Sequence, residues 1–319
     1  MKAAVVDAFD SPPRYGDFPE PAAEADEVLV NVRAAAVTQL ARFFAAGKHP
    51  AAPRPPMVPG MDGVGLVDGR RVYFSFPRPP VGSMAELVAV KRSYCVPIPD
   101  ELDDVTAAAA ANPGMASWVG LTRRARLVRG ESVLVNGAAG ISGRMAIQVA
   151  KHLGARRVVA TARNPAAEAA LRSLGADAFI PLSDDSAALA EAFRGELRAH
   201  GIDVVLDFLY GSSAEAFLQA CVGPARGAAE PRVRFVQIGT LAGPHITLPA
   251  LALRSSGLEL LGSGLGSASH LELMAGIGEF LAAYPSAGFH IDTAVAALSD
   301  VTAAWSRPSS ARLVLKTQG

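Results

Sequence analysis

The sequence predicts an α/β protein in which a small β-rich part is followed by a doubly wound parallel sheet. The stretch Val133–Gly143, VLVNGAAGISG, joins a short apolar strand to a helix through a glycine turn. Five more apolar runs follow at helix-length intervals, and such runs are typical of strands buried on both faces. Short β patterns with proline and glycine between them precede this stretch, and 319 residues suffice for two hydrophobic cores.

The first part of the chain alternates strand patterns with turns. The dipeptide Asp68-Gly69 between two apolar runs is the strongest short-range signal for a hairpin. Thr38–Gly47 has apolar side chains at helical spacing and ends in glycine, which predicts a short helix. Pro50–Pro59 predicts a loop, because proline cannot enter the interior of a sheet. The strands expected here are Lys2–Phe9, Glu27–Val37, Asp62–Val67, Arg70–Ser75 and Ala85–Val90.

A helical pattern separates the two parts. Thr106–Ala111 starts an alanine-rich helix, and Met115–Val128 resumes the helical spacing of apolar residues. We expect a break between them at Asn112-Pro113-Gly114, because proline cannot continue the hydrogen-bond ladder of a helix. The domain boundary is therefore expected near Asn112.

Strands and helices alternate in the second part, and a mixed tail follows it. The tail has helical patterns at Leu271–Tyr284 and Ser299–Ser306 and strand patterns at Thr293–Ala296 and Arg312–Lys316. This mixture favours a tail that completes the first domain over one that forms a third. The strands expected in the second part are Val133–Asn136, Val158–Thr161, Ala178–Ile180, Ile202–Asp207, Val233–Ile238 and Leu258–Leu261.

The glycine turn has the features of a diphosphate site. The spacing Ala138-x-Gly140-x-x-Gly143 differs from the dinucleotide fingerprint only at its first position, where alanine can still make a tight turn. Free amides at the helix start, including those of Ile141 and Ser142, and the helix dipole favour an anion there. The alternative is that the small residues serve close packing only.

The end of the second strand of this part selects the cofactor. NAD sites usually place an acidic residue there, whereas this chain has Thr161-Ala162-Arg163-Asn164. Arg163 could pair with a 2′-phosphate, with Thr161 and Asn164 as further donors, so NADP(H) is favoured. The alternative is that Arg163 is an ordinary solvated arginine.

Other cofactor contacts are expected at the carboxyl ends of the strands, where ligands of such sheets bind. Leu182 could line the adenine slot, and Leu209 could contact the ribose or simply cap the sheet. Backbone groups expected to hold the nicotinamide are those of Ile238, Gly239, Thr240, Gly264 and Leu265.

Composition excludes several classes of function. The 30 basic and 30 acidic residues balance, so no general field attracts nucleic acid or an anionic membrane. No apolar run approaches the length of a bilayer span, and the start has no signal-peptide core, so we expect a cytoplasmic protein. Cys95 and Cys221 lie in unrelated elements, which predicts neither a disulfide framework nor a zinc lobe.

Five motifs are spread over the chain: MKAAVV at 1–6, VPGMDGVGLV at 58–67, VLVNGAAGISGRMAIQVAKHLGA at 133–155, LRSLGAD at 171–177 and VVLDF at 204–208. With these motifs the whole chain resembles the zinc-free quinone oxidoreductase (zeta-crystallin-like) branch of the medium-chain dehydrogenase/reductases. The resemblance implies a GroES-like catalytic domain over 1–112, completed by 263–319, and a Rossmann NADP(H)-binding domain over 113–262. It also implies a homodimer paired through the sixth strands.

Zinc ligands of the metal-dependent relatives are replaced in this chain. Val37-Thr38 stands where their first cysteine falls, Met61 stands where their histidine falls, and the six histidines share no ligand spacing. No metal is therefore expected. Similar reductases often carry Asn, Asp and Tyr after the long strand, where this sequence has Thr38, Ala41 and Phe43.

Without zinc or a strong base, the best supported chemistry is hydride transfer to an acceptor that is already electrophilic. We expect an NADPH-dependent reductase of quinones or activated alkenes (enones), with Thr38 and Asn112 as candidate catalytic residues. For Thr38 the alternative is a structural hydroxyl, and for Asn112 it is a cap at the break before Pro113. Two other functions stay open: an enoyl-thioester reductase, and a non-catalytic NADPH-binding sensor or structural protein.

Overall fold

The computed structural model describes residues 1–223 and 230–317, and it divides into two compact units. The first unit contains Met1–Asn112 and His270–Gly319, and the second unit contains Pro113–Ser269. Each unit has its own sheet and its own hydrophobic core. The two units are described separately below.

The second unit is a doubly wound parallel sheet, as the sequence predicts. Its strands lie in the order β10-β9-β8-β11-β12-β13, and all of their pairings are parallel. The middle strands are apolar on both faces because helices cover both sides; Val133, Leu134 and Val135 are each fully buried. The bounds are β8 (Ser132–Asn136), β9 (Arg157–Ala162), β10 (Ala178–Pro181), β11 (Val204–Asp207), β12 (Arg232–Gln237) and β13 (Gly257–Gly262).

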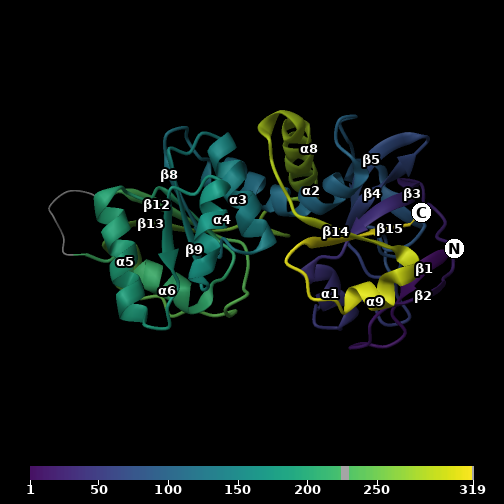
Figure 1. Cartoon of the computed structure of the whole chain (residues 1–319), viewed down its shortest axis with the longest axis horizontal. Helices are drawn as coiled ribbons and strands as arrows, with labels where there is room; N and C mark the ends of the chain where they lie inside the picture. The colour runs from purple at the N-terminus through teal and green to yellow at the C-terminus, as the bar shows by residue number, and fades with distance from the viewer. Residues whose placement is uncertain (224–229, 318–319) are drawn as a thin grey trace. The chain divides into compact units, whose positions relative to one another are not determined.

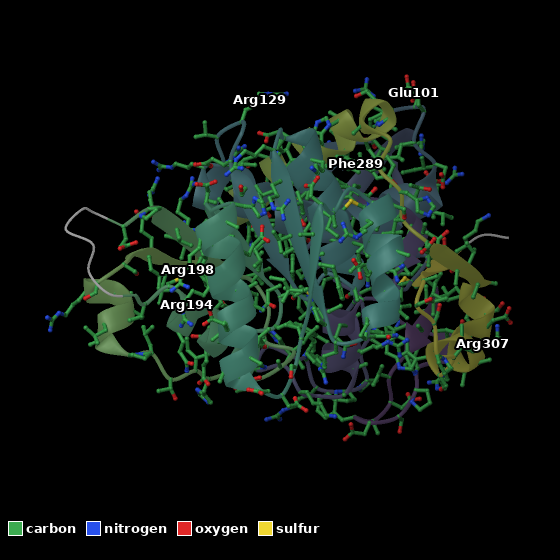
Figure 2. All side chains as sticks on the ribbon, turned by 60° about the vertical axis from the view of Figure 1, so that its left-hand side comes forward. Glu101, Arg129, Arg194, Arg198, Phe289 and Arg307 are labelled. Carbon is green, nitrogen blue, oxygen red and sulfur yellow. The ribbon has the colours of Figure 1, made fainter. Side chains whose placement is uncertain are left out.

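Helices connect these strands, and Figure 1 shows α3, α4, α5 and α6 packed around them. Asp185 caps α5, because its Oδ1 accepts hydrogen bonds from the amides of Ala187 and Ala188. Arg194 and Arg198 lie one turn apart on the outer side of α5, where both form ion pairs with Glu191 (Figure 2). The bounds are η2 (Gly120–Ala125), α3 (Ile141–His152), η3 (Pro165–Ala167), α4 (Glu168–Ser173), α5 (Ser186–Ala199), α6 (Gly211–Ala220) and α7 (Ala250–Arg254).

The first unit contains a mixed sheet in the order β14-β15-β3-β4-β5-β7, with β6 also paired to β3. The last strand, β15, pairs with β3 from the beginning of the chain, and Figure 1 shows these distant segments side by side. A separate pair is formed by β1 and β2. The bounds are β1 (Lys2–Val5), β2 (Arg14–Asp17), β3 (Glu27–Ala36), β4 (Asp62–Val67), β5 (Arg70–Ser75), β6 (Leu87–Lys91), β7 (Cys95–Pro97), β14 (Thr293–Ala297) and β15 (Arg312–Lys316).

The predicted hairpin of the first unit is confirmed. β4 and β5 pair antiparallel in the register Val67↔Arg70, and Asp68 and Gly69 have φ of 50° and 78°. Positive φ at both turn residues matches the right-handed twist of the flanking strands. The remaining helical segments of this unit are α1 (Gln39–Ala45), η1 (Arg92–Tyr94), α8 (His270–Ala287), η4 (Leu298–Asp300) and α9 (Val301–Trp305).

The break expected at Asn112-Pro113-Gly114 is wrong, because one helix, α2 (Asp104–Val119), runs through this tripeptide. The alanines of 107–111 are all fully buried, so burial of this helical stretch outweighs the roughly 3 kcal/mol that an internal proline costs. The helix gives way to the π-helical turn η2, and Arg126, with φ of 51°, ends it.

No helix within the described residues combines the length and the apolar character that crossing a membrane requires.

Candidate functional site

The strand order of the second unit reverses between β8 and β11, and this reversal places the glycine turn. β8 pairs with β9 on one side and with β11 on the other, and the chain leaves β8 directly into Gly137. In doubly wound sheets, ligands bind at the carboxyl ends of the strands at such a switch point. The turn predicted to bind a diphosphate therefore lies where this architecture forms a site.

The three glycines of the turn are required for different reasons. Gly137 has φ of 89°, and a Cβ there would lie 2.8 Å from Cγ of Leu209. A Cβ at Gly143 would lie 2.4 Å from the carbonyl oxygen of Gly137, so α3 can pack against the turn only without a side chain. Gly140 is exposed, and the nearest atom to a Cβ there would be the Gly137 oxygen at 3.8 Å. Gly140 is therefore the glycine that leaves space for a ligand.

Ala138 does not make the tight turn that the sequence assigned to it. Gly137, one residue earlier, takes the left-handed conformation instead. Ala138 is fully buried, and its amide donates to the carbonyl oxygen of Thr161 at 2.8 Å. Its backbone N–H is consequently unavailable to a phosphate, and Ala138 stabilises the turn through this hydrogen bond.

The first turn of α3 supplies the free amides. Gly140 is its N-cap residue and has no side chain to cap the helix, and no acidic residue lies in the first turn. Within residues 1–223 and 230–317, no acceptor is recorded for the amides of Ile141, Ser142 and Gly143. Three unpaired amides at the positive end of a twelve-residue helix are a favourable environment for an anion.

A buried hydrogen-bond chain holds the glycine turn in place. The amide of Gly137 donates to Oγ1 of Thr161 at 3.0 Å, and that hydroxyl donates to Oδ1 of Asn136 at 2.8 Å. Nδ2 of Asn136 donates in turn to Oδ1 of Asp207 at 2.8 Å and to Oγ of Ser213 at 2.9 Å. The hydroxyl predicted to bind the 2′-phosphate is thus fully buried and engaged, so Thr161 positions the turn.

Sequence reasoning missed Asn136, Asp207 and Ser213. The available signal was a polar residue at the end of two otherwise apolar strands, VLVN and VVLD. Burial raises the pKa of Asp207, while hydrogen bonds from the backbone of Tyr210 and Leu209 and from Asn136 act in the opposite direction. The carboxylate thereby fixes the end of β8 to the end of β11.

The carboxyl end of β11 leads into a strained turn that positions Leu209. Oδ1 of Asp207 accepts from the amides of Leu209 and Tyr210, both at 3.0 Å. Tyr210 has φ of 59° and ψ of −153°, a region that is costly for any residue with a Cβ. These bonds keep the side chain of Leu209 against Gly137, beside the predicted diphosphate position.

The end of β9 presents the groups predicted to select NADP(H). Arg163 is exposed, and no hydrogen bond or ion pair is recorded for it in the described part of the chain. Oδ1 of Asn164 accepts from the amide of Ala166 at 3.0 Å, which leaves its NH₂ group to donate elsewhere. Leu182 is half-buried after β10 and donates its amide to the carbonyl oxygen of Ala162 at 2.9 Å. Arg163, Asn164 and Leu182 therefore share one edge of the sheet.

The groups predicted for the nicotinamide follow β12 and β13. Both Ile238 and Gly239 donate their amides to the carbonyl oxygen of Asp207, at 2.8 and 3.0 Å. The amide of Gly264 donates to Oγ of Ser267 at 2.8 Å. These three N–H groups are therefore bound within the protein and cannot hold the nicotinamide. The backbone groups that remain for it are carbonyl oxygens and those of the exposed Thr240 and Leu265.

The two candidate catalytic residues lie in the first unit. Thr38 is 5% exposed and caps α1, because its Oγ1 accepts from the amide of Ala41 at 3.0 Å. Its hydroxyl proton remains able to donate one hydrogen bond. Asn112 is half-buried inside α2, so the alternative that it caps a break is wrong.

In the part of the chain that the structure describes, no group of three or more His, Cys, Asp or Glu side chains could hold a metal ion.

Comparisons with known proteins agree with this architecture. The family model described as zinc-binding dehydrogenase matches residues 142–278. Probable NADPH-dependent quinone reductase tdiC of Emericella nidulans is 31% identical over 329 residues, which cover 88% of this chain and 90% of that protein. The quinone oxidoreductase of Thermus thermophilus, solved alone and with NADPH, has a TM-score of 0.77 and 29% identity over 99% of this chain and 100% of its own.

A second kind of relative matches only part of this chain. Polyketide synthase GfsB of Streptomyces halstedii is 37% identical over 158 residues, which cover 50% of this chain and 2% of that protein. The match to the quinone reductase, by contrast, extends over most of both chains. With its GroES-like unit and its Rossmann unit, the chain belongs to the zinc-free quinone oxidoreductase branch of the medium-chain dehydrogenase/reductase family.

Proposed function

We propose that this protein is an NADPH-dependent reductase of quinones or activated alkenes. The observation that carries the proposal is the pair of anion sites in the second unit: the three free amides of α3 and the unpaired guanidinium of Arg163. The first suits a diphosphate and the second a 2′-phosphate. Family membership and the quinone reductase relative support the same activity.

The residues present fit the cofactor. Gly140 leaves the amides open to a close approach, and residues 161–164 contain no carboxylate that would repel a 2′-phosphate. When bound, NADPH supplies the hydride. Ile141, Ser142 and Gly143 would bind its diphosphate, and Arg163 and Asn164 its 2′-phosphate.

The acceptor requires orientation and a polarised carbonyl, because quinones and enones are already electrophilic. The hydroxyl group of Thr38 would donate a hydrogen bond to that carbonyl oxygen. Asn112 would orient the acceptor or the carboxamide of the nicotinamide. Two electrons arrive with the hydride, and a proton taken up from water completes the hydroquinone or the saturated ketone. The free hydroxyl donor of Thr38 and the polar side chain of Asn112 support these roles.

The predicted domain roles and the dimer belong to the same proposal. The first unit would be the catalytic domain and the second the cofactor domain. β13 is the last strand of its sheet, and among the described residues it pairs only with β12. An open edge with a partly exposed Leu260 offers a surface for pairing with a second copy. Light scattering tests the dimer, and a cytoplasmic location stays a prediction from the sequence.

Cofactor binding and turnover test the proposal separately. NADPH should bind more tightly than NADH, and absorbance in the nicotinamide band should fall when a quinone or an enone is added. Arg163→Ala should weaken NADPH binding about 10- to 100-fold, the value of one charge-assisted contact, and leave NADH binding unchanged. Arg198→Ala on α5 is the matched control, because this arginine already pairs with Glu191. Preference for NADH in the wild-type protein would refute the cofactor assignment.

An enoyl-thioester reductase is the second candidate, favoured by the likeness to a polyketide synthase over half of this chain. Turnover of a crotonyl thioester at a higher kcat/KM than any quinone would establish it instead. Tight NADPH binding without reduction of either acceptor would indicate a sensor or a structural protein.

A further inference from the structure

Three polar side chains are buried together in the sheet of the first unit. Asp62 is 1% exposed, Tyr73 is fully buried and Arg312 is 8% exposed. The hydroxyl of Tyr73 donates to Oδ2 of Asp62 at 2.7 Å. Oδ1 of Asp62 and Nε of Arg312 have no recorded hydrogen-bond partner within the described residues. None of the three has a role in the activity proposed above.

Asp62, Tyr73 and Arg312 come from strands of one sheet, in which β15, β3, β4 and β5 are neighbours (Figure 1). Asp62 begins β4 opposite Ser75 of β5, and Tyr73 lies two residues from Ser75 on the same strand. Arg312 begins β15, which pairs with β3 next to β4. The cluster therefore lies where β3 ends.

Two hydrogen bonds join β15 to Val37, the residue that follows β3. The amide of Val37 donates to the carbonyl oxygen of Leu313 at 2.8 Å, and Nη1 of Arg312 donates to the carbonyl oxygen of Val37 at 3.4 Å. Thr38 follows Val37 directly and starts α1. The position of the Arg312 side chain thus acts on the residue that precedes Thr38.

Burying charged groups is a costly way to hold a sheet together. Well-packed apolar residues of similar volume usually serve stability as well or better. Val64, which lies opposite Tyr73 in the strand pair, is apolar and fully buried. Polar groups retained at this point therefore indicate a role beyond packing.

We propose that Asp62, Tyr73 and Arg312 form a positioning group that orients Thr38 toward the acceptor, and that this orientation depends on the ionised carboxylate of Asp62. The proposal rests on the function proposed above. Ionised Asp62 compensates the buried cation of Arg312 and keeps it under Val37. Once Asp62 is protonated, the guanidinium has no counter-charge in the cluster and moves toward water, away from the Val37 carbonyl group.

The groups around Asp62 determine the pH at which its carboxylate is protonated. Burial raises its pKa to about 6, while the hydrogen bond from Tyr73 and the charge of Arg312 act in the opposite direction. Tyr73 and Arg312 are the titratable groups that face it, and Ser75 is the polar neighbour across the strand pair. The rate of the enzyme should therefore fall as the pH is lowered through about 6.

Three variants and three measurements test the proposal on the full chain. In the wild type, kcat/KM for the quinone should fall as the pH is lowered through about 6. Asp62→Asn should lower kcat/KM at neutral pH about tenfold or more, the order expected for a misplaced catalytic group, and should abolish the acid limb. Tyr73→Phe removes a bond that lowers the pKa of Asp62, so the limb should move to higher pH.

Asp104→Asn is the matched control, because Asp104 pairs with Arg33 and Arg71 in the same unit, at 2.6 and 2.8 Å, and should keep the wild-type profile. The Kd of NADPH should stay constant in all three variants.

Hydrogen exchange over residues 36–41 gives a readout that needs no acceptor. Corrected for the intrinsic rate, protection of this segment should fall below about pH 6 in the wild type and should not depend on pH in Asp62→Asn. If no acceptor is reduced but this exchange pattern is found, the proposed function fails and the positioning group stands. An unchanged acid limb in a folded Asp62→Asn, or in Tyr73→Phe if Asp62→Asn does not fold, overturns the proposal.

Discussion

Replacing Gly140 and Gly143 one at a time by alanine separates the packing of the glycine turn from phosphate binding. A Cβ at Gly143 would lie 2.4 Å from the carbonyl oxygen of Gly137 and 2.6 Å from Cα of Ala138. Both neighbours are backbone atoms, so α3 and the turn must move apart. A Cβ at Gly140 would meet only the Gly137 oxygen at 3.8 Å, an ordinary contact distance.

The two substitutions should therefore have different effects on the free energy of unfolding, whereas both should weaken the binding of NADPH. Gly143→Ala should lower the free energy of unfolding by about 1–3 kcal/mol, the usual cost of overpacking. Gly140→Ala should change it by less than about 0.5 kcal/mol, because φ of −72° and ψ of 164° suit any residue. The new methyl group at Gly140 would stand where a diphosphate approaches the amides of Ile141 and Ser142. Losing those bonds should cost about 2 kcal/mol, or a roughly 30-fold increase in the Kd of NADPH.

Urea unfolding followed by circular dichroism measures the first quantity, and quenching of protein fluorescence by NADPH measures the second. Gly195→Ala on α5 is the control, because nothing lies within 4 Å of a Cβ there. It should leave binding unchanged and raise stability by up to about 1 kcal/mol through helix propensity. If Gly140→Ala binds NADPH as tightly as the wild type, the assignment of the α3 amides to the diphosphate is refuted.

The remaining predictions concern four side chains. Thr161→Val should lower the free energy of unfolding by about 1–3 kcal/mol in urea titrations, because the amide of Gly137 and Oδ1 of Asn136 each lose a buried partner. Thr38→Val should reduce kcat/KM for quinones about tenfold or more while the Kd of NADPH stays constant, as steady-state rates and equilibrium binding can show. Arg163→Ala should bring the Kd values of NADPH and NADH, measured by titration calorimetry, close to each other. The pKa of Asp62 is raised from 3.8 to about 6, so between these values the folded state binds more protons than the unfolded state. In this window Asp62 should therefore contribute a fall in stability of about 3 kcal/mol with rising pH, which thermal unfolding measures as the difference between the wild type and Asp62→Asn.

Each of these predictions has a contrary outcome. Wild-type stability in Thr161→Val would mean that the buried chain does not support the turn. A change in Kd for NADPH in Thr38→Val would place this hydroxyl in cofactor binding. Loss of NADH affinity in Arg163→Ala would mean that the guanidinium binds a group common to both cofactors. A difference in stability between the wild type and Asp62→Asn that rises with pH would mean that the folded protein stabilises the charged form of Asp62.

The sequence was sufficient to predict the alternation of strands and helices because each step depends on local pattern. The apolar runs of β8, β9 and β11 admit only buried strands, and Asp68-Gly69 admits only a tight hairpin turn. The preference for NADP(H) could be predicted in the same way, because residues 161–164 follow the second strand and contain an arginine but no acidic residue. The NADPH-dependent relative supports this prediction.

What the sequence did not predict depends on tertiary packing. The helix α2 passes through Pro113 because the alanines before it are buried from several sides, and no local rule reports that burial. The assignment of the tight turn to Ala138 instead of Gly137 failed for a similar reason, since φ at each residue follows from how β8 meets α3. The amides of Ile238 and Gly239 are bound by Asp207, a partner about thirty residues away in the sequence.

The pairing of β15 with β3 also bears on how the chain is made by the ribosome. Residues 113–269 form a unit that is continuous in the sequence, so it can fold as soon as it has emerged. The sheet that contains β3, the strand before Thr38, must wait for Arg312–Lys316, which are translated nearly three hundred residues after β3 begins. During that interval Ala34–Ala36 at the end of β3 lack their partner β15, although β4 and β6 can already pair with the rest of the strand, so we expect the first unit to complete its folding after the second.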